Sequence, residues 1–252
     1  MKAIKKNGYN ICFTLIVIVL ALMPLLLMNG FVKSTTVLFL GKCMAFAIVA
    51  IGLDLIWGYT GILSLGHGLY FCLGAYGMGM YLKLVQTKGN ITDFMQVGGL
   101  TELPLIWKPF LTLPGTILMI IVVPVAVSGL IGYFIFKNRV KGVYFSIISQ
   151  ALTWAAYSIF IALSPYTNGN VGISQIQSIL GSLRGPKNEG NLITLFYIAL
   201  IFMVIIYAVS YRLVKTKFGK LLIAIRDGEN RTYFAGYCVS NYKNVIYVVS
   251  AV

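Results

Sequence analysis

The sequence has few of the side chains from which active sites are usually built. Only 10% of its 252 residues are charged, six are Asp or Glu, and one is histidine. A single histidine argues against a His-based metal centre. A catalytic pairing of His67 with Asp54 lacks an obvious nucleophile, because no GxSxG turn surrounds Ser64. We therefore expect a chain that is not an enzyme.

Paired cysteines and nucleotide-binding motifs are also missing. Three of the four cysteines lie inside apolar runs and no two form a CxxC pair, which argues against a disulfide framework or a metal site. No GxxxxGK[ST] motif occurs. If the protein takes part in ATP-driven transport, ATP and its Mg²⁺ must bind to another chain, and we expect no cofactor in this one.

Apolar residues, by contrast, make up 59% of the chain. A soluble domain is about 25% charged, so this surface requires a lipid solvent. Backbone groups in lipid must be bonded internally, and the apolar runs lack the alternation of a β-barrel. We predict an all-α integral membrane protein, a polytopic helical bundle of about six full spans and the start of a seventh. The six predicted spans are residues 11–32, 35–57, 61–82, 117–136, 142–163 and 192–211.

The last apolar run, residues 244–252, stops early. As a helix, its eight residues from Val245 to Val252 would extend only about 12 Å, whereas the hydrocarbon core is about 30 Å thick. We expect residues 1–252 to form one transmembrane domain that is truncated at its C-terminal end.

Basic residues are in large excess, with a formal charge of +14. In a soluble protein this would suggest nucleic acid. Here the basic residues occur in short tracts between apolar runs, so we expect them to orient the chain in lipid rather than to bind nucleic acid. Three clusters, within residues 2–6, 137–141 and 212–231, fall on one side if every span crosses. This pattern predicts a multi-pass membrane protein with a cytoplasmic N-terminus.

The most unusual stretch is WGYTGILSLGHGLY, residues 57–70, where two spans meet. Glycine costs about 1 kcal/mol relative to alanine in a helix. The glycines therefore indicate either close helix packing or an unwound segment that lines a solute pathway. The candidate pathway residues are Tyr59, Thr60, Gly61, Ser64, Gly66, His67 and Gly68.

Two ionisable side chains lie at or near membrane depth. His67 is a functional candidate for that reason, although it could equally be neutral and bonded to a backbone carbonyl. Asp54 is the only intramembrane carboxylate, and its place near the cytoplasmic end of its span allows it to reach the headgroups. The sequence leaves the roles of both residues open.

The longest cytoplasmic stretch is residues 212–243. Its apolar residues have helical spacing, so it could be a helix on the lipid headgroups or a docking helix for a soluble partner. Acidic residues would face anionic headgroups, which favours the partner. The candidate docking residues are Arg226, Asp227, Glu229, Arg231 and Gly236. Gly228 is a poor helix residue, so we expect the helix to be interrupted there.

Three blocks resemble permease subunits of the branched-chain amino acid ABC importers, the LivM family. They are IGLDLIWGYTGILSLGHG (residues 51–68), KGVYFSIISQA (141–151) and AIRDGENR (224–231), and the resemblance covers essentially the whole chain. Within the family, the chain is most similar to the urea permeases (UrtC type). That similarity lies in WGYTG (57–61), MGMY (78–81), DFM (93–95) and LPLIWKPF (103–110).

The resemblance implies a heteromeric importer. Its partners would be a second permease of LivH or UrtB type, two cytoplasmic ATPase subunits, a periplasmic solute-binding protein and membrane lipids. Residues 226–231 would match the region that couples to the ATPase. The solute would be urea or, alternatively, a branched-chain amino acid (Leu, Ile or Val). A passive small-solute channel would explain the glycines but not the charged cytoplasmic segment.

Overall fold

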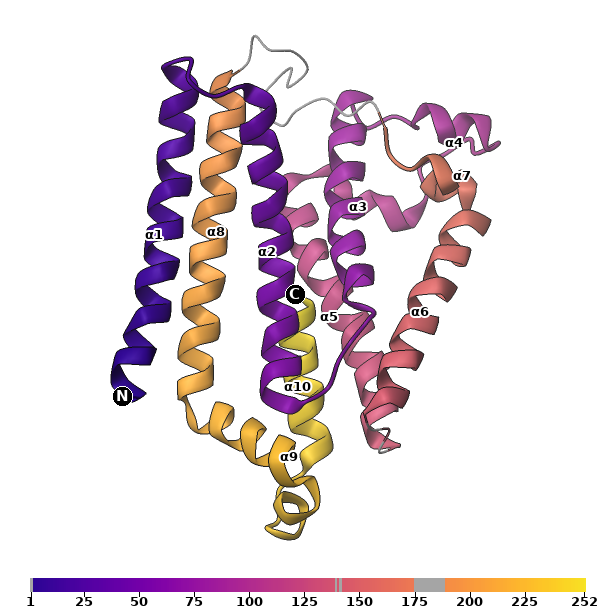
Figure 1. Cartoon of the computed structure of the whole chain (residues 1–252). Coiled ribbons are helices and arrows are strands. Elements are labelled where there is room, and N and C mark those ends of the chain that lie inside the picture. Colours follow the sequence, from indigo (N-terminus) through magenta and orange to yellow (C-terminus); the bar gives the residue numbers. More distant parts are fainter. Residues whose placement is uncertain (1, 139, 141, 175–188) are drawn as a thin grey trace. The chain divides into compact units, whose positions relative to one another are not determined.

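A computed structural model describes residues 2–138, 140, 142–174 and 189–252 (Figure 1). Within these residues every regular element is a helix. The elements are α1 (Lys2–Met28), α2 (Ser34–Thr60), α3 (His67–Gln86), α4 (Asp93–Val97), η1 (Leu105–Leu111), α5 (Leu113–Lys137), α6 (Val143–Ala162), α7 (Ser164–Thr167), η2 (Gly169–Val171), α8 (Glu189–Lys215), α9 (Lys217–Phe234) and α10 (Val239–Ala251).

Among the residues that the structure describes, four helices are long and apolar enough to cross a membrane. They are α2, α5, α6 and the Leu192–Lys215 part of α8, with mean hydropathies between 1.4 and 2.8. At most 17% of each apolar window is buried inside the protein. Such an exposed apolar surface is stable in lipid and not in water. The prediction of an all-α, polytopic membrane protein is confirmed.

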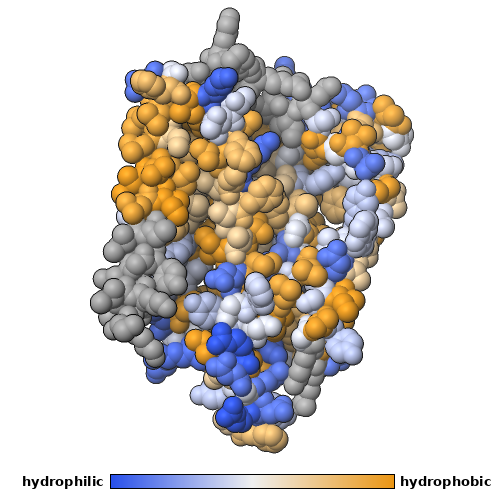
Figure 2. Space-filling view, viewed as in Figure 1, coloured by the Kyte–Doolittle hydropathy of each residue, from blue (hydrophilic) through white to orange (hydrophobic). Residues whose placement is uncertain are grey.

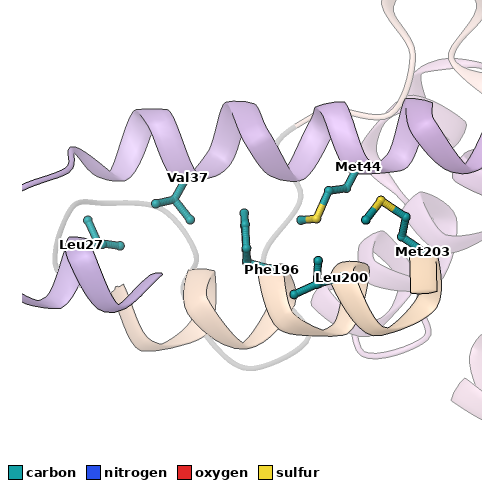
Figure 3. Packing of buried hydrophobic residues seen from close by; sticks show 6 residues of the cluster. All are labelled: Leu27, Val37, Met44, Phe196, Leu200 and Met203. Atoms are coloured by element: carbon teal, nitrogen blue, oxygen red, sulfur yellow. The ribbon is translucent and has the colours of Figure 1, made fainter. Parts of the chain in front are cut away.

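One compact unit contains α1, α2 as far as Ile51, and α8 as far as Leu213. Its described core is a row of interlocking side chains from these three helices (Figure 3): Leu27, Val37, Met44, Phe196, Leu200 and Met203. Figure 2 shows apolar side chains over much of its visible described surface. Lipid tails are as apolar as these side chains, so close van der Waals packing holds the three helices together.

The first helix ends earlier than the span predicted at residues 11–32. The chain leaves α1 at Met28 because Gly30 adopts a left-handed conformation, with φ +75°. The amides of Gly30 and Phe31 then donate to the carbonyls of Leu27 and Leu26, at 2.9 and 3.0 Å. These two bonds form a Schellman motif, which terminates a helix.

The second compact unit starts at Gly52 and contains α3 to α7, α9 and α10. Within it, α10 packs against α5 and α3 (Figure 1). Two glycines permit close approach: a Cβ at Gly132 would overlap Asn244, and one at Gly52 would lie 2.7 Å from the Ser250 carbonyl oxygen. The last helix begins at Val239, ahead of the expected residue 244, and its first turns contact α9 through the Tyr242–Phe218 ring pair and the Lys243–Glu229 ion pair.

A second cluster fixes the far end of α3. Its buried members are Met80, Leu84, Met95, Trp107 and Phe110. The Trp107 indole N–H donates to the Tyr166 carbonyl at 3.0 Å, and the Tyr76 hydroxyl donates to the Thr167 carbonyl at 2.9 Å. These bonds tie α3 and η1 to α7, the short helix that follows α6.

Candidate functional site

The site begins where the chain stops being helical between α2 and α3. We expected one span over residues 61–82, but α3 begins only at His67. Gly61 has φ +71°, which residues with a side chain rarely adopt, and it ends α2. Residues 61–66 then lie outside any helix. Of the two alternatives left open by the glycines, the broken segment is therefore present here.

Two serines of α6 bond the backbone of this segment. The Ser146 hydroxyl donates to the Leu63 carbonyl at 2.7 Å, and the Ser149 hydroxyl accepts from the Leu65 amide at 3.1 Å. A Cβ at Gly66 would lie 2.8 Å from the Ser149 carbonyl oxygen, so only glycine fits this approach. Non-helical backbone at membrane depth requires such partners.

His67, the first residue of α3, is held by α10. It is 4% exposed, and its Nε2 lies 2.9 Å from the Ser250 hydroxyl, which itself donates to the Tyr247 carbonyl at 2.8 Å. Its Nδ1 is buried without a hydrogen-bond partner among the described residues. A buried polar atom left unpaired costs about 1–3 kcal/mol, so such an atom needs an explanation.

Tyr247 stands at the centre of this region. Its hydroxyl lies 2.7 Å from the Tyr70 hydroxyl. Its ring makes edge contacts with His67, Tyr70, Phe136 and Phe145 at centroid distances between 5.5 and 5.8 Å. One side chain of α10 thus joins α3, α5 and α6, and edge-to-face pairs of this kind add about 0.5–1.5 kcal/mol each.

The predicted pathway residues do not all meet. Ser64, Gly66 and His67 are buried together at the break. Thr60 is buried but donates to the Ile56 carbonyl of its own helix at 2.5 Å, which is a local bond. Tyr59 is half-buried, and Gly61 is exposed beside the Arg226 side chain.

Gly68 is exposed and lines a separate apolar cavity of about 450 Å³ between α3 and α6. The wall of this cavity includes Cys72, Tyr76, Thr153 and Phe160. Asp54 is exposed on α2, whereas the buried His67 ring is hydrogen-bonded to Ser250. The two ionisable groups therefore have different surroundings.

The sequence alone does not identify several residues of the site. Ser146 and Ser149 lie in the block 141–151, but nothing there indicates which residues they bond. Tyr70, Tyr247 and Ser250 are ordinary members of apolar runs. The bond between His67 and Ser250 joins residues 183 positions apart, which a single sequence does not reveal.

The candidate docking residues lie on α9 and, in the case of Gly236, just after it; hydrophilic side chains gather around α9 in Figure 2. Arg226 donates to the Gly58 carbonyl at the end of α2 at 2.7 Å and pairs with Asp227 at 3.0 Å. Arg231 is exposed. Glu229 is turned toward α10, where it pairs with the buried Lys243 at 2.9 Å. Arg226 and Glu229 thus join α9 to α2 and α10.

The expected interruption at Gly228 is confirmed, because its backbone (φ −165°, ψ 71°) leaves the helical region in the middle of α9. Gly236 follows α9 with φ +89°, which turns the chain toward α10. Between these glycines the side chains of Tyr233 and Phe234 are exposed, Phe234 at 86%. The helix end thus presents a basic and aromatic tip.

Unwound backbone beside membrane-spanning helices is a recurring feature of solute transport proteins. The sequence profile of one family, described as "Branched-chain amino acid transport system / permease component", matches residues 35–252. The chain belongs to this family, whose members are the membrane-spanning components of ABC transporters. Searches of curated proteins and of solved structures gave no match.

Proposed function

We propose that this chain is the permease subunit through which an ABC importer moves urea across the bacterial inner membrane. The observation that carries the choice of solute is the chemistry around the break. Its buried polar side chains, Ser64, His67, Tyr70 and Tyr247, offer hydroxyls and an imidazole and no carboxylate. A zwitterionic solute would need charged partners, because burying an unpaired charge is costly. Urea is neutral and needs only hydrogen bonds.

Branched-chain amino acids are the second candidate. They are favoured by the family's description and by the apolar cavity of about 450 Å³ beside Gly68, whose wall suits an aliphatic side chain. The two solutes differ in charge and apolar size, so one uptake assay separates them.

The assay compares cells that lack this gene with cells in which it is restored, each given labelled urea or labelled leucine. We expect urea uptake to fall to background in the deletion and leucine uptake to persist. Unchanged urea uptake with lost leucine uptake would exclude urea in favour of the second candidate. Uptake that persists after the ATPase subunits are deleted would favour a passive channel.

The proposed partners follow from the transporter class. They are a second permease, two cytoplasmic ATPase subunits that bind ATP and Mg²⁺, and a periplasmic solute-binding protein. Exposed residues on α9, chiefly Arg231 and its aromatic neighbours, supply the docking surface for the ATPase. Asp227 and Gly236 lie on the same segment.

The proposed orientation places the N-terminus and α9 in the cytoplasm, as the basic clusters favour. Cys238 is an exposed free thiol between α9 and α10, so it can report on this orientation. We expect a membrane-impermeant maleimide to label Cys238 in inverted vesicles and not in intact spheroplasts, with Cys238→Ser as the control. Labelling of Cys238 in intact spheroplasts would show that the orientation is the opposite of the proposed one.

A further inference from the structure

We propose that Nδ1 of His67 is a hydrogen-bond acceptor for the N–H groups of the transported solute, and that Ser250 is the positioning residue that turns this nitrogen into an acceptor. The proposal rests on the proposed function and specifies the solute class, a neutral molecule with N–H donors. It starts from one geometric fact: Nδ1 is buried without a hydrogen-bond partner among the described residues.

The hydrogen bonds of Ser250 decide which nitrogen carries the proton. The Ser250 hydroxyl has one hydrogen, and it donates this hydrogen to the Tyr247 carbonyl at 2.8 Å. The contact of 2.9 Å between Ser250 and His67 Nε2 must then be a donation from the ring. A neutral imidazole has a single N–H, so Nδ1 has a free lone pair and can only accept.

The position of His67 suits a contact with a solute. It is the first residue of α3, directly after the non-helical segment, and the N-terminal amides of a helix inside a membrane favour carbonyl oxygens. Ser64 is 1% exposed, and its hydroxyl also has no bond of good geometry among the described residues, although it adjoins the Tyr247 hydroxyl. Both unpaired groups therefore adjoin Tyr247 at the break.

The experiment uses two substitutions at position 67, each of which retains a polar group near one of the two ring nitrogens of the histidine. Gln at position 67 retains an N–H near Nε2 for Ser250 but has no acceptor at Nδ1. Asn retains an oxygen near Nδ1 but does not reach Ser250. The readout is urea uptake by the full importer, the permease with its partner subunits in proteoliposomes, together with the thermal unfolding midpoint of the complex.

For His67→Gln we expect KM for urea to rise about five-fold, the loss typical of one neutral hydrogen bond, with an unchanged unfolding midpoint. For His67→Asn we expect KM near wild type and a lower midpoint. Ser250→Ala leaves the His67 ring free to adopt the other tautomer, so the KM of this variant should rise. Adding His67→Gln to Ser250→Ala should not raise KM further.

If His67 has only a structural role, the order of the two KM values is reversed. His67→Gln then has the KM of the wild type, and His67→Asn has a raised KM. That order overturns the proposal. A wild-type complex that takes up no urea overturns instead the proposed function. Urea uptake by wild type with an unchanged KM in His67→Gln overturns only the role of Nδ1.

Discussion

At the scale of single residues, the pair of hydroxyls on Tyr70 and Tyr247 is the most informative contact. Both rings are at most 3% exposed, and the two oxygens lie 2.7 Å apart. Each hydroxyl satisfies the other inside an aromatic cluster. Removing one oxygen leaves its partner buried and unpaired, whereas removing both leaves an apolar contact of similar shape.

This asymmetry gives a prediction. Tyr247→Phe and Tyr70→Phe should each lower the free energy of unfolding by about 1–3 kcal/mol, and the double variant should lose clearly less than the sum of the two. Denaturant unfolding of the purified protein in detergent measures all three variants. Strictly additive losses would mean that the two hydroxyls do not bond each other.

The sequence indicates only part of this site. His67 could be predicted because it is the only histidine and interrupts an apolar run. Its partner Ser250 could not, because a serine in an apolar run looks the same whether it bonds its own helix or another one. Tyr247 is 177 positions from Tyr70, and no local pattern records which helices meet in space.

At the scale of helices, the spans are more predictable than their ends. Lipid forces apolar runs into helices, so hydropathy finds them. Their ends depend on single backbone conformations and on partners from elsewhere. Gly61 ends α2 with a positive φ, and the start of α3 is delayed to His67 because Ser146 and Ser149 of α6 bond the intervening backbone. No residue within 61–82 indicates that these two serines bond the segment.

The contact between α5 and α10 gives a prediction with a control on the same helix. A Cβ at Gly132 would overlap the Asn244 side-chain oxygen and lie 2.9 Å from the Tyr247 ring. One at Gly129 would meet only Val248, at 3.8 Å. We expect Gly132→Ala to destabilise the protein by about 1–3 kcal/mol through overpacking, and Gly129→Ala to be neutral or up to about 1 kcal/mol stabilising.

Thermal unfolding of the two alanine variants beside wild type measures this difference. Because both changes add the same methyl group to α5, their helix propensities cancel in the comparison. Equal midpoints would show that α10 does not approach α5 as closely at Gly132 as described here.

At the scale of the whole molecule, α9 is linked by side-chain bonds to the helices around the break. Arg226 bonds the end of α2 through the Gly58 carbonyl, and Glu229 pairs with Lys243 of α10. The α10 helix carries Tyr247 and Ser250, which contact α3. A partner that displaces α9 therefore acts directly on α2 and, through α10, on α3, the two helices that border residues 61–66. Such a linkage is the coupling that an ATP-driven permease requires.

The last prediction separates docking from this internal linkage. Arg231 is exposed, so Arg231→Glu should weaken the ATPase contact and lower coupled transport by at least about tenfold without loss of folding. Arg226→Glu removes the bond to Gly58, so ATP hydrolysis should continue while transport falls. Lys220→Glu, the same charge change at another exposed position of α9, is the control. Uptake and ATP hydrolysis measured on one reconstituted complex distinguish these outcomes, and normal transport in Arg231→Glu would exclude this end of α9 as the docking surface.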